Sequence, residues 1–179
     1  MVSEEQILAC VLAGKTSEFR KLVDRYQQPV FRFARNLIRD EHDAEDITQE
    51  VFLAAFNNLA SFNAKRASLQ TWLFTIARNR CVNYLKRTRP VIDSEAIANT
   101  IRAASGDESA RNEFWSRLDL ALDALPIEQK TAFVLSEIVA LPYTDIAHIE
   151  STTLGTVKSR IYRAKQRLRT AMAPTQGDK

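Results

Sequence analysis

The sequence predicts an all-α protein made of two small helical domains joined by a flexible linker. The 179 residues include only 4 Gly and 5 Pro, and the stretches between them are rich in residues that lose little entropy in a helix. Apolar residues recur at steps of three and four over most of the chain, and this period fades in one internal segment. A composition of 45% hydrophobic and 26% charged residues is typical of a globular protein with a buried core.

The first helices are expected near the N-terminus. Ser3 and Gln6 have the spacing of a capping box, which predicts a helix from there to Gly14. A second helix is expected from about Ser17. Pro29 is expected in the first turn of a third helix, because proline suits that position.

The stretch DAEDITQEVFLAAF predicts a helix, capped by Asp43, that gathers acidic side chains on one face. At about 100° per residue, the face opposite the core carries Asp46, Gln49, Glu50 and Leu53. An apolar residue ringed by acidic and amide groups is typical of a small protein-binding patch, and its partner would be a basic protein surface. The alternative is a solvated helix turn with one exposed leucine.

Residues 62–88 combine positive charge with aromatic rings. After a non-periodic loop, Ser68 is expected to open a long helix to about Arg87. Its basic side chains have no acid among them and suit phosphates, while the amides of Asn79 and Asn83, one turn apart, suit base edges. The aromatic residues near this charge are Phe62, Trp72, Phe74 and Tyr84. Their rings either stack on the bases of a single strand or belong to the core.

The segment 89–111 mixes Pro, Gly, Ser, Asp and Asn with small apolar residues, which is the composition of a linker. We therefore expect one domain over 1–88, the linker over 89–111, a second domain over 112–173 and a disordered tail over 174–179.

The second domain is expected to be a four-helix unit that ends in a helix-turn-helix. LPYTDIAHIE predicts a short helix, and TLGTVKSRIYRAKQRLRTAM predicts a long one with Leu154, Val157 and Ile161 in its buried stripe. Six basic side chains lie on its other faces, with no acidic residue among them. Because like charges along one helix repel each other, we expect an anion such as DNA phosphate to neutralise them. In this motif the second helix lies in the major groove and reads bases from its N-terminal end. The candidate DNA contacts are Thr153, Thr156, Lys158, Ser159, Arg160, Tyr162, Arg163 and Arg167. The alternative is a solvated basic face on an ordinary amphipathic helix.

Other chemistries find little support in the sequence. Cys10 and Cys81 lie in apolar helical patterns without metal-site spacing, so buried thiols in a reducing cytoplasm are expected. His42 and His148 are far apart, and neither a glycine-rich phosphate loop nor clustered metal ligands occur. No leader and no transmembrane span are visible. We expect a cytoplasmic protein that is not an enzyme, uses no metal or cofactor and does not insert into membranes.

Three motifs together resemble a known family. DAEDITQEVF, the F-x(9)-W-L-x-x-I-A-x-N run from Phe62 to Asn79, and LPYTDIA followed by GTVKSRIYRAKQRLR are similar to the extracytoplasmic-function (group 4) sigma factors of bacterial RNA polymerase. The similarity keeps the same order and covers nearly the whole chain. It implies a sigma factor that binds core RNA polymerase, directs promoter-specific initiation and is held inactive by an anti-sigma factor.

The resemblance also implies roles for particular residues. Asp46, Gln49 and Glu50 stand where the family contacts the clamp helices of the largest polymerase subunit, and Leu53 completes that patch. The residues implied in capturing and melting the minus-ten element are Phe62, Asn63, Lys65, Trp72, Arg78, Asn79, Asn83, Lys86 and Arg87. The last two helices correspond to the reader of the minus-thirty-five element. The family usually has Gly where this chain has Ser151, which predicts strain in the turn between them.

Two other functions stay open on the sequence alone. One is a two-domain transcriptional regulator that binds duplex DNA through its C-terminal helices and uses the N-terminal half for dimerisation or sensing. The other is an interaction protein that sequesters a regulator. Only a sigma factor is expected to co-purify with core polymerase and direct initiation at a defined start.

Overall fold

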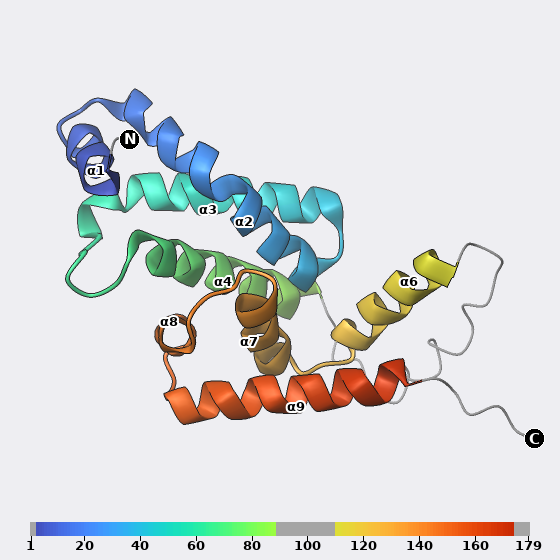
Figure 1. Ribbon diagram of the computed structural model, residues 1–179. Coiled ribbons are helices and arrows are strands. Elements are labelled where there is room, and N and C mark those ends of the chain that lie inside the picture. The colour runs from blue at the N-terminus through green and yellow to red at the C-terminus, as the bar shows by residue number, and fades with distance from the viewer. Residues whose placement is uncertain (1–2, 89–109, 174–179) are drawn as a thin grey trace, which may run out of the picture.

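The computed structural model describes residues 3–88 and 110–173, and all regular elements in those two ranges are helical (Figure 1). The first half comprises α1 (Glu4–Leu12), the 3-10 turn η1 (Thr16–Phe19), α2 (Arg20–Ile38), α3 (Glu41–Asn57), the 3-10 turn η2 (Leu59–Ser61) and α4 (Leu69–Thr88). The second half comprises α6 (Ala110–Asp123), α7 (Ile127–Glu137), α8 (Tyr143–Ile149) and α9 (Leu154–Met172). The prediction of an all-α protein with two helical units is confirmed. Most of the predicted linker and the whole predicted tail lie outside the described residues.

The N-terminal helix begins as predicted. The Ser3 hydroxyl accepts a hydrogen bond from the backbone N–H of Gln6 at 3.2 Å, and the Gln6 side chain accepts one from the N–H of Ser3 at 3.0 Å. The helix ends before Gly14, whose φ of +93° is a conformation that glycine adopts without strain.

The prediction that Pro29 begins a helix is wrong, because Pro29 lies inside α2, a single helix of 19 residues. A proline there removes one hydrogen bond of the helix and costs about 3 kcal/mol. The same helix buries six side chains, including Leu22, Val30 and Phe33, against α3 and α4. Each large buried apolar side chain contributes about 1.5 to 3 kcal/mol, so the packing outweighs the missing hydrogen bond.

Helix α3 begins earlier than predicted. Asp40, not Asp43, caps it, and the Asp40 carboxylate accepts the backbone N–H of Asp43 at 3.0 Å. Asp43 lies in the first turn, where its carboxylate accepts a hydrogen bond from the hydroxyl of Tyr84 on α4. This contact ties the start of α3 to the end of α4.

The core of the first half lies between α2, α3 and α4. Phe33 and Phe74 are fully buried and meet edge to face, with ring centroids 5.6 Å apart. Phe74 is therefore a core residue, so it does not offer a stacking surface to a nucleic acid strand.

In the second half α7, α8 and α6 all pack on α9. The inward stripe of α9 is confirmed for Val157, Ile161, Ala164 and Leu168, which are buried. Leu154 is 40% exposed instead, because it is the first residue of α9, at the end of the helix that extends past α7 (Figure 1). The two halves also touch each other: α8 packs on α4, and α7 packs on α2.

Candidate nucleic-acid and protein interfaces

The acidic face of α3 is exposed as a whole. Ala44, Ile47, Val51 and Ala55 are buried, and Asp46, Gln49, Glu50 and Leu53 lie on the solvent side. We call these four exposed residues the α3 patch. Leu53, which lies at the C-terminal end of this patch, is 62% exposed. The geometry predicted for this face is confirmed, and the identity of its partner stays a prediction.

The α3 patch borders the basic helix α4. Glu50 Oε2 lies 3.2 Å from Arg80 Nη1, and both side chains are about half exposed. A pair this exposed contributes only about 0.2 to 1 kcal/mol to stability. Glu50 can therefore exchange Arg80 for another cationic partner at little cost to the fold.

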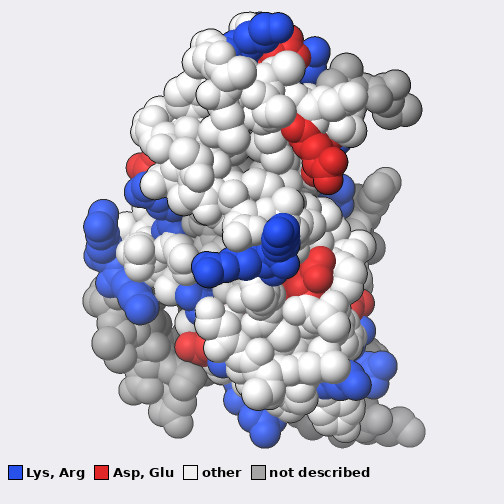
Figure 2. All heavy atoms as spheres, turned by 90° about the vertical axis from the view of Figure 1, so that its left-hand side faces the viewer, with Lys and Arg blue, Asp and Glu red and all other residues white. Residues whose placement is uncertain are grey.

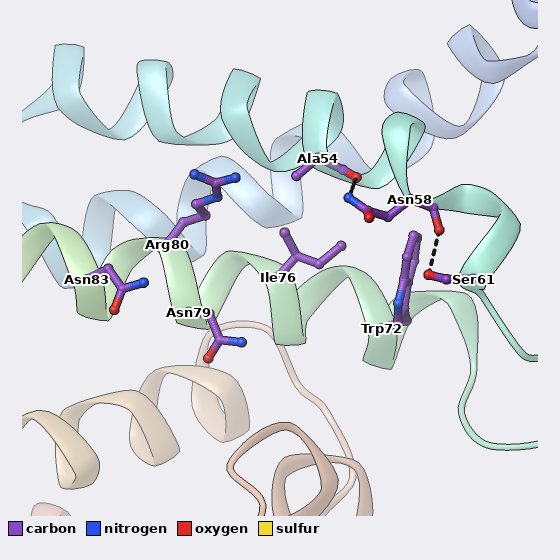
Figure 3. A pocket seen from close by; sticks show the side chains of 8 residues that line it. All are labelled: Ala54, Asn58, Ser61, Trp72, Ile76, Asn79, Arg80 and Asn83. Atoms are coloured by element: carbon purple, nitrogen blue, oxygen red, sulfur yellow. Dashed lines mark hydrogen bonds between the residues drawn. The ribbon is translucent and has the colours of Figure 1, made fainter.

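An open hollow of about 360 Å³ lies where the end of α3 and η2 meet α4 (Figure 3). Its lining residues are Ala54, Asn58, Ser61, Trp72, Ile76, Asn79, Arg80 and Asn83. The Ser61 hydroxyl donates to the backbone carbonyl of Asn58 at 2.7 Å, which fixes one wall. Trp72 is half-buried and tilts against Phe62, with ring centroids 5.3 Å apart. The hollow thus combines an aromatic surface, amides and a guanidinium, the groups that hold an unstacked base.

Most of the residues predicted for the minus-ten element are on the surface, and three of them, Trp72, Asn79 and Asn83, line this hollow. The exposed ones are Asn63, Lys65, Asn79, Asn83, Lys86 and Arg87, while Phe62 and Trp72 are half-buried. Asn63 has a local role as well, since its side chain accepts the backbone N–H of Lys65 at 2.9 Å and shapes the loop.

Arg78 is the exception among the predicted basic contacts. Its side chain is half-buried, and its Nε is buried without a hydrogen-bond partner among the described residues. Its Nη1 donates to the side-chain oxygen of Asn79 at 3.3 Å. Arg78 is therefore partly buried, with its Nε inside the protein and its Nη1 at the surface beside Asn79.

The sequence prediction missed three polar residues that line the hollow: Asn58, Ser61 and Arg80. Arg80 was grouped with the other basic side chains of its helix, and Asn58 and Ser61 follow the acidic helix where the periodicity weakens. Only the folded structure, in which they line the same hollow, shows that they share a surface (Figure 3).

The turn between α8 and α9 contains the strain predicted at Ser151. Its φ is 49°, in the left-handed region, which costs a non-glycine residue about 1 to 2 kcal/mol. The N–H of Ser151 donates to the carbonyl of His148, and the N–H of Thr152 to that of Ala147, which is the Schellman pattern of a helix end. The chain therefore makes this turn without glycine.

The N-terminal end of α9 is fixed by its own hydroxyl groups. Thr153 Oγ1 accepts the N–H of Thr156 at 3.2 Å and caps the helix. The Ser159 hydroxyl donates to the carbonyl of Thr156 at 2.9 Å. These three predicted contacts thus help to shape the helix end, where Thr153 is exposed and Thr156 and Ser159 are half-buried.

The basic helix α9 does have acidic neighbours, contrary to what its own sequence indicates. Arg160 pairs with Glu150 at the end of α8, and Lys165 Nζ lies 3.0 Å from Glu137 Oε1 of α7. The predicted contacts that are exposed are Thr153, Lys158, Tyr162, Arg163 and Arg167. Arg160 has a structural partner, so it is less available to DNA than the other predicted contacts.

Glu150 is buried, and burial raises the pKa of its carboxyl group above the usual value. The guanidinium groups of Arg160 and Arg78 act against this rise. Arg160 thus pairs directly with this carboxylate, and the charge of Arg78 attracts it without a direct hydrogen bond to it.

On the face shown in Figure 2, the charged side chains do not form one continuous stripe. Figure 2 shows Lys and Arg in several separate groups on one face, including a group at mid-height, with acidic side chains and wide uncharged areas between them. Such a surface favours binding at defined places over uniform attraction to a polyanion.

The two cysteines are free thiols. Cys81 is buried, and burial raises the pKa of its thiol to about 12, while Cys10 is half-buried. Among the residues that the structure describes, no helix is both long and apolar enough to cross a bilayer.

Comparison with known proteins connects these surfaces to a family. Residues 22–91 match the model of sigma-70 region 2, and residues 115–168 match that of sigma-70, region 4. The chain belongs to the sigma-70 family. RNA polymerase sigma-H factor of Pseudomonas aeruginosa is 31% identical over 96% of the chain and 94% of its own length. ECF RNA polymerase sigma factor SigW of Bacillus subtilis is 30% identical over 89% of the chain and 91% of its own length. The chain is thus a member of the extracytoplasmic-function (ECF) sigma factors.

Solved structures show the same fold. CnrH, determined in complex with the cytosolic domain of CnrY, matches with a TM-score of 0.73 and 25% identity over 94% of this chain and 97% of that one. The sigma factor RpoE of Bartonella quintana, in complex with the anti-sigma factor NepR, matches with a TM-score of 0.67 and 24% identity over 89% of this chain and 99% of that one. The fold of this ECF sigma factor is therefore shared with both of these solved chains.

Proposed function

We propose that this ECF sigma factor, as a group 4 member, binds core RNA polymerase and directs initiation at promoters with a minus-ten and a minus-thirty-five element. One observation carries the proposal: an exposed acidic patch, an aromatic and amide-lined hollow, and a basic helix-turn-helix lie on one chain in the family's order. We assign region 2 to residues 1–88, the linker to 89–111 and region 4 to 112–173. Such a factor acts in the cytoplasm as an initiation factor rather than an enzyme.

The α3 patch is the proposed polymerase contact. Asp46 and Glu50 offer negative charge to a basic surface, and the exposed Leu53 supplies apolar contact between them. A DNA partner is disfavoured on this face, because carboxylates repel phosphates.

The hollow and the loop before α4 are the proposed site for the melted non-template strand. Trp72 and Phe62 would stack on bases, Asn79 and Asn83 would read base edges, and Lys86 would hold phosphate. A stacked base contributes about 1 to 3 kcal/mol. Trp72→Ala should therefore slow opening of the promoter more than it weakens the first closed complex.

Helix α9 is the proposed reader of the minus-thirty-five element. Lys158, Ser159 and Arg163 lie on its outer side toward the N-terminal end, where they would meet base edges, with Thr156 near the backbone. Arg167, further along, would hold phosphate.

The decisive experiment is transcription in vitro with core polymerase and mapping of the starts. A sigma factor gives transcripts from a defined start with core enzyme alone, whereas a DNA-binding regulator or a sequestering protein gives none. Permanganate footprinting of the same complexes with Trp72→Ala tests the strand site. A bubble that opens as fast as in the parent would place that site elsewhere.

We also propose that an anti-sigma factor covers the polymerase-binding surfaces when the signal is absent. The support is physical: Leu53 and Phe56 are large apolar side chains on the surface of α3, 62% and 37% exposed, and such surfaces usually receive a partner. Full transcriptional activity in uninduced cells, without an associated inhibitor, would contradict this regulation.

A further inference from the structure

A buried carboxylate lies at the turn between the two helices of the proposed promoter reader. Glu150 caps the C-terminal end of α8, and the exposed fraction of its side chain is 0%. Its backbone N–H donates to the carbonyl of Ile146 at 2.9 Å, and Ser151, with its left-handed φ of 49°, follows directly. The hydrogen bonds of the helix end thus fix the backbone from which this carboxylate extends.

This position is unfavourable for a carboxylate. The C-terminal end of a helix carries partial negative charge, which repels an acidic side chain. Burial also removes the water that would solvate the charge. One oxygen of the carboxylate, Oε1, is buried and has no hydrogen-bond partner among the described residues. For the stability of the turn alone, an apolar or cationic side chain would suit residue 150 better.

The partner of this carboxylate is a cation of the proposed reading helix. Glu150 Oε2 forms an ion pair with Nη1 of Arg160 on α9, whose side chain is only 25% exposed. Arg163, the proposed base reader, is exposed and lies three residues further on, about 60° around the helix. Without the carboxylate, the long side chain of Arg160 could extend to solvent. Arg160 would then stand beside Arg163 as a second free cation.

We propose that Glu150 is a positioning residue for promoter reading: it holds Arg160 against the end of α8 and so withholds a phosphate contact beside the base-reading Arg163. The role in promoter reading rests on the proposed function, whereas the withholding of Arg160 does not. A phosphate contact strengthens binding to every sequence, and only base contacts separate one sequence from another. Withholding Arg160 keeps the attraction to arbitrary DNA weak, so that α9 binds firmly only where its base contacts add to it.

The variant Glu150→Gln tests the proposal, because it removes the charge and keeps the size of the side chain. Asp119→Asn is the matched control, with the same loss of charge at an exposed position of α6. Arg160→Ala and the double variant Glu150→Gln/Arg160→Ala complete the set. Glu150→Leu is a second form of the change, since an apolar side chain of similar size suits a fully buried position. Circular dichroism should show parental helix content for all of them.

The first readout is binding of the full chain to a fluorescently labelled DNA duplex of random sequence between about 50 and 200 mM salt. One added phosphate contact steepens the slope of log affinity against log salt by about one. We expect this steeper slope for Glu150→Gln and Glu150→Leu, and the parental slope for Asp119→Asn. A purely structural ion pair would not change the slope. Glu150 variants with the slope and affinity of the control would therefore overturn the proposal.

The arginine variants show whether Arg160 is the cation that is released. Arg160→Ala should keep the parental slope while Glu150 is present, because the paired arginine makes no phosphate contact. In the Glu150→Gln background the same change should lower the slope by about one. A lower slope for Arg160→Ala in the parental background would mean that Arg160 binds DNA in spite of its partner, and this result would overturn the proposal.

Transcription in vitro with core polymerase separates this inference from the proposed function. If the chain is not a sigma factor, no variant initiates, and the salt slopes still report whether Glu150 withholds Arg160. If it is one, Glu150→Gln should give about threefold or more transcript than Asp119→Asn from a promoter with a weakened minus-thirty-five element, at holoenzyme concentrations far from saturation. Equal yields from these two variants would overturn the role of Glu150 in promoter reading.

Discussion

Replacement of Glu50 by lysine should separate polymerase binding from folding. The Glu50 side chain is 55% exposed, and its pairing with Arg80 is the contact that the change removes within the protein. An exposed pair of this kind contributes about 0.2 to 1 kcal/mol. The free energy of unfolding should therefore fall by no more than about 1 kcal/mol.

The effect on polymerase binding should be larger, because a partner's cation would then face another cation at a desolvated contact. Loss of such a charged contact costs about 2 to 5 kcal/mol, which corresponds to a roughly thirtyfold to several-thousandfold rise in the dissociation constant for core enzyme. The difference between this range and the small cost to the fold makes the variant informative.

The assay is titration of fluorescently labelled sigma factor with core polymerase, alongside urea unfolding of the free protein. Glu45→Lys is the control, since it makes the same charge change on α3 at an exposed position about 140° around the helix from Glu50. Parental affinity of Glu50→Lys, or an equal loss in Glu45→Lys, would refute the assignment of the α3 patch.

Three further outcomes are expected. Arg163→Ala and Arg167→Ala are both to be tested as holoenzyme on promoters that differ in the minus-thirty-five element. Arg163→Ala should weaken promoter binding by about 1 to 3 kcal/mol and relax the base preference at one position. Arg167→Ala should weaken binding to all of these promoters alike and lower the slope of log affinity against log salt by about one. The reverse pattern would show that α9 is rotated in the groove. Iodoacetamide at pH 8 should alkylate Cys10 in the native protein and should react with Cys81 only after denaturant exposes it. The reason is that the Cys81 thiol is buried and has a pKa of about 12. Equal rates of alkylation of the two cysteines in the native protein would contradict this prediction. Ser151→Gly should relieve part of the roughly 1 to 2 kcal/mol of left-handed strain and raise the melting temperature by a few degrees, and a lower melting temperature would mean that the serine side chain supports the turn.

Periodicity was enough to place the helices and the inward faces. Ile47 and Val51 on α3, and Val157 and Ile161 on α9, follow the spacing of a helix with one buried side, and all four are buried. The capping box at Ser3 is equally local, because its two hydrogen bonds join residues three apart.

Errors arose where contacts distant in the chain outweigh local preference. Pro29 favours a helix start when judged by its neighbours, yet the apolar face of α2 packs on two other helices and runs through it. Arg160 belongs to a run of basic residues without acids, but its partner Glu150 comes from another helix. Lys130 directly precedes the apolar stretch TAFVL, and no local pattern indicates that one of its partners is a carbonyl 93 residues away.

The ion pairs of α9 determine whether this helix is already folded before it meets DNA. A basic segment that repels itself would need a nucleic acid to fold, and its structure would then form together with binding. Here Glu150 and Glu137 already balance Arg160 and Lys165 within the protein. The helix is therefore preformed before any promoter is met, so binding carries no ordering cost for it. Heparin or free DNA should leave the helix content of the chain unchanged.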